Sequence, residues 1–290
     1  MSASEESQLV SISSIGILAG GGDIPRYFME SCHKQGIRTF VVGFEGQTAP
    51  ETLDGVPHMW SRLGAVGSIL KTLKKEGVSD LVMIGKIRRP SLKELKPDLK
   101  AAEFFAKEGL NVVGDDGLLR SLRRFLEGEG FQIHGAHKFM PDLLVPSGHI
   151  AGPKLSQNAW RDIERGIEVL KAMSPLDIGQ AVVVQQGHIL GVEAAEGTDA
   201  LIQRCSSLQR KGAGAVLVKL CKDGQDEDID LPTIGPETIV NAVDAGFSGI
   251  AVHAGHSFLF GLEDASQHAE KGQIFLIGVD PEALNRGEND

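Results

Sequence analysis

The sequence has 290 residues, of which 41% are hydrophobic and 23% charged, and its formal net charge is −10 at pH 7. This composition is typical of a folded globular protein and excludes a disordered chain. The acidic balance excludes a general nucleic-acid binder, which needs a clustered excess of Lys and Arg, and three widely spaced cysteines exclude a disulfide framework.

The length predicts more than one domain, because a single hydrophobic core usually stops growing below this size. Glu5 and Glu6 stand where a secretory signal would carry positive charge. No stretch approaches the ~20 apolar residues that span a bilayer. We therefore expect a cytoplasmic protein that touches a membrane at most peripherally, has no nucleic-acid partner and assembles as a homodimer.

The first half of the sequence alternates strands with helices. Strands are expected at residues 15–19, 38–42 and 80–85, and helices at residues 23–33, 65–76 and 117–126. This alternation is typical of α/β proteins. We predict an N-terminal Rossmann-like domain at residues 10–140, with a parallel sheet and helices.

The second half begins after a turn-rich stretch, residues 141–155, which we interpret as an inter-domain linker. Helices are expected at residues 157–173 and 236–246, a hairpin at 180–193, and further strands at 213–220, 247–253 and 273–279. We predict a C-terminal α/β catalytic domain with a mixed sheet at residues 156–290.

A candidate phosphate-binding loop lies between the first strand and the first helix, and comprises Gly20, Gly21, Gly22 and Asp23. Backbone N–H groups and the helix dipole can hold a phosphate at such a place. The dinucleotide fingerprint would need glycine where Pro25 stands. A plain tight turn is the alternative interpretation, and Glu45 after the second strand keeps an NAD-linked oxidoreductase open as an alternative function.

Two groups of cations stand out in the first half. Lys86, Arg88 and Arg89 follow a strand of the predicted parallel sheet, at the edge where such sheets bind ligands, and suit an anionic substrate. A solvated loop is the alternative. The other group lies on the helix at 117–126 and is interpreted as an exposed helix face: Arg120, Arg123 and Arg124.

Carboxylates dominate the sequence around residue 226, where Asp226, Glu227, Asp228 and Asp230 stand close together. Oxygen ligands on a loop suit Mg²⁺, which binds one or two carboxylates together with substrate phosphates. A solvated acidic loop is the alternative.

Further acids, Glu193 and Glu196, precede a helix that Thr198 is expected to cap and are candidates for orienting water. The pair His253 and His256 lacks a third ligand nearby and is interpreted as structural.

Six ordered segments from both halves resemble the LpxI family. They are residues 18–25 (LAGGGDIP), 84–90 (IGKIRRP), 114–119 (GDDGLL), 176–181 (LDIGQA), 192–199 (VEAAEGTD) and 225–235 (QDEDIDLPTIG). The resemblance implies hydrolysis of UDP-2,3-diacylglucosamine to UMP and 2,3-diacylglucosamine 1-phosphate, an early step of lipid A synthesis, with Mg²⁺ as cofactor. Asp228 departs from the family pattern, in which arginine is expected at this position.

The resemblance also directs the assignment of roles. Asp226 and Asp230 are expected to hold Mg²⁺ and to be catalytic, with Glu193 or Glu196 orienting the attacking water. Besides the glycine loop and the cations after the third strand, the substrate is expected to contact Gln180, Thr198, Lys219 and Thr233. A non-catalytic nucleotide-sugar binding module remains an alternative, together with the oxidoreductase.

Overall fold

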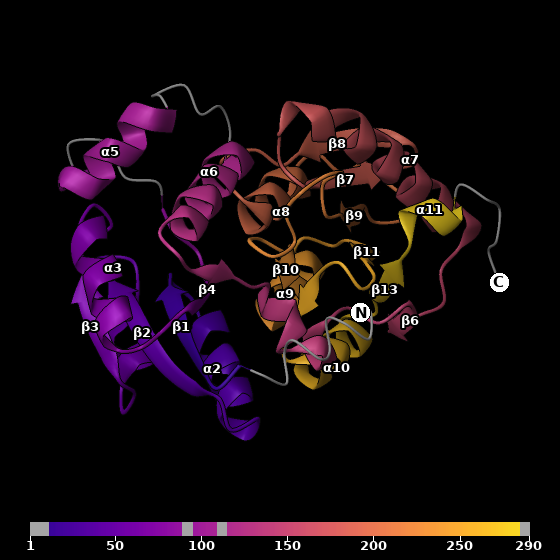
Figure 1. The fold of residues 1–290 in the computed structure, drawn as a ribbon. Helices are drawn as coiled ribbons and strands as arrows, with labels where there is room; N and C mark the ends of the chain where they lie inside the picture. The colour runs from indigo at the N-terminus through magenta and orange to yellow at the C-terminus, as the bar shows by residue number, and fades with distance from the viewer. Residues whose placement is uncertain (1–11, 89–94, 109–114, 285–290) are drawn as a thin grey trace. The chain divides into compact units, whose positions relative to one another are not determined.

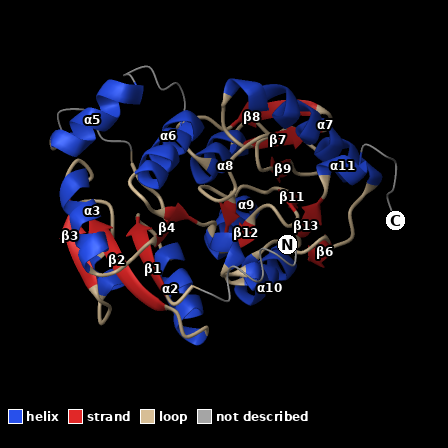
Figure 2. Ribbon diagram, in the orientation of Figure 1, coloured by secondary structure: helices blue, strands red, loops and turns tan. Residues whose placement is uncertain are grey.

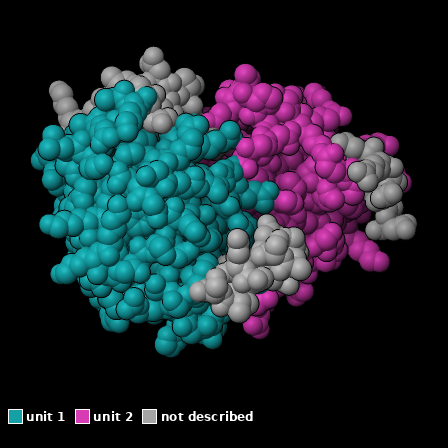
Figure 3. All heavy atoms as spheres, viewed as in Figure 1, with its two compact units in different colours: residues 1–141, 226–230 teal, residues 142–225, 231–290 magenta. Residues whose placement is uncertain are grey.

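The computed structural model describes residues 12–88, 95–108 and 115–284, and Figures 1 and 2 trace its elements. The chain forms two compact units, coloured separately in Figure 3. Unit 1 holds residues 1–141 together with the short segment 226–230, and unit 2 holds residues 142–225 and 231–290. None of the helices in the described part of the chain is long and apolar enough to cross a membrane.

Unit 1 is built on a five-stranded sheet with the order β3-β2-β1-β4-β5. All neighbouring strands pair in parallel. Its strands are β1 (Ser14–Ala19), β2 (Arg38–Phe44), β3 (His58–Ser61), β4 (Asp80–Ile84) and β5 (Gln132–Ile133). This strand order is that of a Rossmann-like sheet, and the predicted parallel sheet is confirmed.

Unit 1 has four α-helices among the described residues, and the third of them, residues 99–108, packs on its neighbouring helices, in part through Phe104 and Phe125. The four helices are α2 (Ile24–Lys34), α3 (Val66–Lys75), α5 (Leu99–Glu108) and α6 (Asp115–Gly128), with short 3₁₀ turns η1 (Pro50–Leu53) and η2 (Ala136–Lys138). Helices α3 and α6 share a core with β2 and β4 that includes Leu70, Leu81 and Leu126. The ring of Phe28 on α2 packs edge-on against Phe139, with centroids 5.4 Å apart.

Unit 2 is built on a six-stranded mixed sheet with the order β6-β13-β11-β9-β7-β8. Strands β9, β11 and β13 are parallel, whereas β6 and β7 run antiparallel to their neighbours in this group. The strands are β6 (Gly148–Ala151), β7 (Ala181–Gln185), β8 (His188–Val192), β9 (Val216–Lys219), β11 (Gly249–His253) and β13 (Phe275–Val279). The predicted mixed sheet and the β7–β8 hairpin are confirmed.

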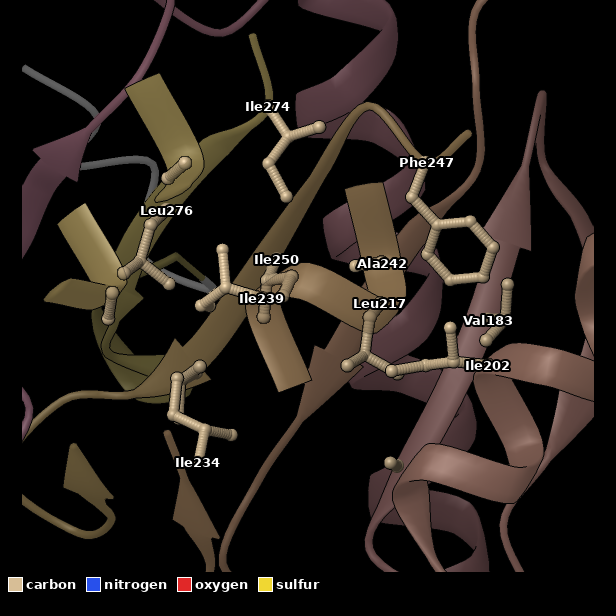
Figure 4. Packing of buried hydrophobic residues seen from close by; sticks show 14 of the residues in the cluster. Val183, Ile202, Leu217, Ile234, Ile239, Ala242, Phe247, Ile250, Ile274 and Leu276 are labelled. Carbon is tan, nitrogen blue, oxygen red and sulfur yellow. The ribbon is translucent and has the colours of Figure 1, made fainter. Parts of the chain in front are cut away.

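Helices cover both faces of the unit 2 sheet, and a short parallel pair, β10 (Thr233–Ile234) with β12 (Phe258–Leu259), lies beside it. The helices are α7 (Gln157–Met173), α8 (Thr198–Ser206), α9 (Pro236–Asp244), α10 (Leu262–Gly272) and α11 (Pro281–Leu284), with 3₁₀ turns η3 (Pro141–Leu143) and η4 (Ser174–Leu176). Figure 4 shows the core under α8, α9 and α10, where Ile202 and Ile239 meet Leu217 and Ile250 of the sheet.

The second core of unit 2 lies under α7, on the opposite face of the same strands. Ser156 caps this helix by accepting a hydrogen bond from the backbone of Ala159. Helix and sheet approach closely at Gly166, because a Cβ there would lie 2.6 Å from Cγ2 of Val218. The helix predicted at residues 157–173 is confirmed with the same first and last residues.

Two local features differ from the sequence-based predictions. Part of the segment expected to be a linker forms β6, which pairs with β13 as an edge strand of unit 2. Residues 226–230, expected within the C-terminal domain, belong to unit 1. The turn-forming residues in 141–155 suggested a linker. The sequence did not reveal β6, because this strand forms by pairing with β13, which is distant along the chain.

Candidate functional site

A buried network of three side chains lies at the carboxyl edge of the unit 2 sheet. Lys219 ends β9, Thr198 begins α8 and Glu193 directly follows β8. The ammonium of Lys219 donates to the Thr198 hydroxyl at 2.6 Å, and that hydroxyl donates to Oε1 of Glu193 at 2.7 Å. Only 5% of Lys219 and 6% of Glu193 is exposed. One hydroxyl therefore joins a buried ammonium to a buried carboxylate.

Strand direction explains why residues so far apart in sequence meet here. Strands β8 and β9 both run antiparallel to β7, which lies between them, so their carboxyl ends reach the same edge. Ala181, the first residue of β7, lies opposite Lys219 and accepts a hydrogen bond from the backbone of Glu193 at 2.8 Å. Ligands of open α/β sheets bind at such carboxyl edges.

Thr198 does not cap α8, contrary to the prediction. Gly197 occupies the N-cap position and makes no side-chain cap, and the helix begins at Thr198 itself. The hydroxyl is instead committed to Lys219 and Glu193. The first turn of a helix presents N–H groups that have no partner within the helix, at the positive end of its dipole. Together with the ammonium of Lys219, this turn suits a phosphate.

Gln180 connects the network to a cavity in unit 2. Its backbone N–H donates to Oε2 of Glu193 at 3.0 Å. Its side-chain Oε1 is buried and has no hydrogen-bond partner among the described residues. The cavity, of about 340 Å³, is also lined by Lys222, His253 and His256. The rings of the two histidines lie 4.5 Å apart, centroid to centroid.

Two other predicted residues of unit 2 are engaged elsewhere. Oε1 of Glu196 accepts a hydrogen bond from Arg204 at 2.6 Å, and this hydrogen bond lowers the pKa of the Glu196 carboxyl below its ordinary value. The hydroxyl of Thr233 donates to the backbone oxygen of Leu231 at 3.2 Å. The structure therefore brings together Gln180, Glu193, Thr198 and Lys219, but it does not add Glu196 or Thr233 to their network.

The glycine loop of unit 1 pairs with the end of β4. The amide of Gly20 donates to the oxygen of Ile84 and that of Gly21 to the oxygen of Lys86, each at 2.8 Å. A Cβ on Gly20 would lie 2.6 Å from the Lys86 oxygen, so the close approach requires glycine. These two amides are engaged within unit 1, and contact of Gly20 and Gly21 with substrate stays a prediction. Gly22, with a φ of +85°, completes the turn.

The predicted cations of unit 1 lie next to this loop. Lys86 donates its amide to the oxygen of Gly21 at 2.9 Å. The backbone of Arg88 is held by the side chain of Gln47, whose Oε1 accepts from the Arg88 amide at 2.9 Å. Arg89 lies outside the described residues. Lys86 and Arg88 thus follow β4 at the carboxyl edge, and their predicted contact with substrate stays a prediction.

The acidic segment 226–230 binds cations of unit 1. Nη1 of Arg123 on α6 donates to both carboxylate oxygens of Asp226 at 2.7 Å. Nζ of Lys138 lies 2.6 Å from Oδ1 of Asp228. The backbone amide of Asp230 donates to the oxygen of Asp226 at 3.1 Å. Asp226 and Asp228 are therefore paired with protein cations, and Arg123 is not merely part of an exposed helix face.

The pKa shifts in this cluster follow from burial and from the ion pairs. Burial opposes ionisation of Asp228, but the hydrogen bond and charge of Lys138 and the charge of Arg123 outweigh it and lower the pKa of the Asp228 carboxyl. Burial likewise lowers the pKa of His137, although the charge of Asp228 opposes that shift. These directions agree with an ionised, paired Asp228 at neutral pH.

The arrangement of the acidic segment does not fit a divalent cation as it stands. Both oxygens of Asp226 are taken by Arg123, and a cation there would face the guanidinium charge. Across residues 12–88, 95–108 and 115–284, no group of three or more His, Cys, Asp or Glu side chains is placed to hold a metal ion. Asp226 and Asp230 as metal ligands therefore remain a prediction.

Arg123 and Lys138 are the residues of this cluster that the sequence did not reveal. The separation of Arg123 and Asp226 is 103 residues along the chain. The only signal in the sequence is the charge of the arginines on α6, which solvation explains equally well.

The fold and these clusters define a two-domain α/β protein, with a Rossmann-like unit and a second unit whose sheet edge suits a phosphate-bearing ligand. Residues 14–143 match the LpxI N-terminal domain, and residues 146–277 match the LpxI C-terminal domain. The UDP-2,3-diacylglucosamine pyrophosphatase LpxI of Caulobacter vibrioides is 35% identical over 277 residues, which cover 92% of this chain and 98% of that protein. The chain belongs to the LpxI family.

Two solved structures show a distant likeness to this chain. The biotin carboxylase subunit of pyruvate carboxylase is 15% identical, with 59% of this chain and 34% of that chain covered and a TM-score of 0.24. Isoflavone reductase is 12% identical, with 97% and 83% covered and a TM-score of 0.29. Likenesses at this level carry no argument about function.

Proposed function

We propose that this protein hydrolyses the diphosphate bond of UDP-2,3-diacylglucosamine to UMP and 2,3-diacylglucosamine 1-phosphate, in lipid A biosynthesis. Family membership and the activity for which the Caulobacter relative is named support this choice. The observation that carries it is the buried network of Lys219, Thr198 and Glu193 at the carboxyl edge of the unit 2 sheet. A cation and a helix N-terminus at one edge are suited to a diphosphate.

The reaction adds one water across the diphosphate. The water oxygen forms a bond to one phosphorus, the bond from that phosphorus to the bridging oxygen breaks, and the bridging oxygen leaves with the other phosphate. Negative charge grows on the phosphoryl oxygens as this happens. Groups fixed in place beforehand stabilise that charge without having to reorganise.

Each residue of the network has a distinct part in this scheme. The ammonium of Lys219 and the first-turn N–H groups of α8 would bind phosphoryl oxygens and stabilise their growing charge. Glu193 holds the Thr198 hydroxyl by accepting its hydrogen bond at 2.7 Å, which turns the hydroxyl lone pairs toward Lys219. Gln180 holds the other oxygen of Glu193 through its backbone amide. The carboxylate thereby orients the cation and is a candidate acceptor of the water proton.

We also propose Mg²⁺ as cofactor, with Asp226 and Asp230 as its ligands. When bound, Mg²⁺ would neutralise charge on the diphosphate. Because Arg123 holds both oxygens of Asp226 in this structure, that pair would first have to open. Lys86, Arg88 and Arg89 are proposed as further contacts of the anionic substrate.

The proposed substrate bears acyl chains, which partition into a bilayer. We therefore propose that the protein works in the cytoplasm, at the periphery of the inner membrane, and that it does so as a homodimer. Co-sedimentation with anionic lipid vesicles tests the first point, and light scattering on the purified protein tests the second.

The activity is tested by measuring UMP release from UDP-2,3-diacylglucosamine, with Mg²⁺ and with EDTA. We expect release that stops in EDTA and returns with Mg²⁺. Lys219→Met should lower kcat/KM about a hundredfold, or about 2.7 kcal/mol of transition-state stabilisation. Lys211→Met, at an exposed lysine, is the matched control and should leave the rate unchanged.

Other outcomes would each favour a different function. Tight binding of the UDP-sugar without UMP release would indicate a nucleotide-sugar binding module. A change of nicotinamide absorbance with candidate substrates would indicate the oxidoreductase. Full activity in EDTA would refute the cofactor while leaving the hydrolase intact.

A further inference from the structure

The cavity of unit 2 lies at the carboxyl edge of the six-stranded sheet. Three of its lining residues mark that edge, since Leu220 directly follows β9, His253 ends β11 and Asp280 directly follows β13. Its volume of about 340 Å³ falls within the range of about 300 to 1,000 Å³ that small-molecule sites occupy. Ligands of α/β sheets bind outside the carboxyl ends of the strands. The cavity is therefore placed where a small ligand is expected.

The lining of the cavity suits a flat group with a polar edge. Leu170, Leu220 and Pro281 supply apolar surface. The rings of His253 and His256 also line the cavity, and their centroids lie 4.5 Å apart. Nucleobases stack on rings of this kind, because every base has a π-face. The walls therefore fit a nucleobase better than a group without a flat face.

Gln180 brings an unsatisfied acceptor to this cavity. It is one of the lining residues, and its side-chain Oε1 is buried and has no hydrogen-bond partner among the residues that the structure describes. A buried carbonyl without a partner costs free energy. The terminal torsion of a glutamine side chain is broad. Turning the amide into the cavity therefore gives up no hydrogen bond of Oε1 and lets a donor on a ligand reach it.

The backbone of Gln180 is fixed, in contrast to its side-chain oxygen. Its N–H donates to Oε2 of Glu193 at 3.0 Å, and its carbonyl accepts from the amide of Leu220 at 2.9 Å. Gly179 before it has a φ of +52°, which favours glycine. Leu220 in turn follows Lys219 of the buried network. The side chain of Gln180 is thus held where the cavity meets the network that suits a phosphate.

We propose that Gln180 is a specificity-determining residue, which binds the uracil of the nucleotide in this cavity. The carboxamide offers one acceptor and N–H donors, and uracil offers an N3–H donor between two carbonyl acceptors. Oε1 accepts from N3–H, while Nε2 donates to the neighbouring carbonyl of the base. The phosphate of the same nucleotide then extends toward Lys219 and the first turn of α8. The choice of uracil rests on the proposed function, whereas the pairing itself is tested with the nucleotide alone.

The test measures binding of UMP and of its N3-methyl derivative by calorimetry. Methylation removes the donor, so it should raise the Kd of the wild-type protein about tenfold. Gln180→Ala keeps the backbone N–H that binds Glu193, and it should raise the Kd for UMP about tenfold as well. In this variant methylation should change the Kd less than about twofold, because the partner of N3–H is already missing. Ribose 5-phosphate, which lacks the base, should bind the wild type and the variant equally.

The matched control is Gln157→Ala, at an exposed glutamine in the first turn of α7, which should leave the Kd values for UMP and its derivative unchanged. Three results would overturn the proposal: an unchanged Kd for UMP in Gln180→Ala, a methylation effect as large in that variant as in the wild type, or an equal loss of ribose 5-phosphate binding.

A second variant keeps the test decisive if Gln180→Ala does not give a folded protein by its melting curve. Gln180→Met keeps the length of the side chain without its amide, and the same Kd values are expected for it. The proposed function fails separately. A wild-type protein that shows the methylation effect but releases no UMP from UDP-2,3-diacylglucosamine would support the pairing and refute the hydrolase.

Discussion

Replacing Thr198 by valine removes the hydroxyl that joins two buried charges and keeps the shape of the side chain. The hydroxyl accepts from Lys219 at 2.6 Å and donates to Glu193 at 2.7 Å. Hydrogen bonds to charged groups contribute about 1.5 to 3 kcal/mol each to the free energy of unfolding. A buried charge that loses its partner is destabilising, because its lost hydration is no longer compensated. Glu193 keeps the bond from the Gln180 amide, so we expect a loss of about 3 kcal/mol in the free energy of unfolding.

Urea unfolding measures this loss. With an m-value of about 2 kcal/mol per molar, the midpoint should fall by about 1.5 M. Thr198→Ser keeps the hydroxyl and should cost less than about 1 kcal/mol. In the UMP assay, Thr198→Val should lower kcat/KM about a hundredfold while the serine variant stays within tenfold of the wild type. Equal midpoints for the two variants would show that the hydroxyl does not link the charges, and would refute the reasoning.

Two further predictions concern stability. Asp228 has a lowered pKa in the folded protein, so its contribution is present above the ordinary carboxyl value of 3.8 and is lost as the pH falls through the folded-state pKa. Lys138→Met should therefore lower the free energy of unfolding by about 1 kcal/mol at neutral pH. The difference in this free energy between variant and wild type should narrow below about pH 3.8. A difference that does not change with pH would contradict the prediction. Gly166→Ala should destabilise the protein by about 1 to 3 kcal/mol, because its Cβ would lie 2.6 Å from Val218. Gly128→Ala is the control and should not destabilise it, because no atom lies within 4 Å of its Cβ. Thermal melts of both variants measure the two effects.

The sequence predicted those elements whose side chains repeat strongly with the period of a helix or a strand. The hairpin and the helix α7 are examples, since both combine a clear apolar pattern with clear turn or cap residues. It did not predict β3, a four-residue strand in which His58 and Trp60 are exposed. It also did not predict α10, whose buried residues are only Ala265 and Ala269. Short or small-residue patterns are too weak to separate a buried face from a loop.

The candidate site was predictable to the extent that its residues end strands or begin helices. Lys219, Glu193 and Thr198 each occupy such a position, and the sheet brings them to one edge. The role given to Thr198 was nevertheless wrong in part, because capping is a local pattern while its actual partner Lys219 is 21 residues away. Arg123 could not be assigned from a helical pattern, which says which face is polar but not what that face meets.

Unit 1 is discontinuous in the chain, because it takes residues 226–230 from within the sequence of unit 2. A ribosome that has released residue 141 has therefore not yet made Asp226 and Asp228, which pair with Arg123 and Lys138. At synthesis rates of about 5 to 20 residues per second, the intervening segment takes on the order of 5 to 20 seconds to appear. During translation the first half therefore lacks these two ion pairs, although Glu127 still pairs with Arg123. A gene cut at the family boundary near residue 144 would leave the N-terminal fragment permanently without them.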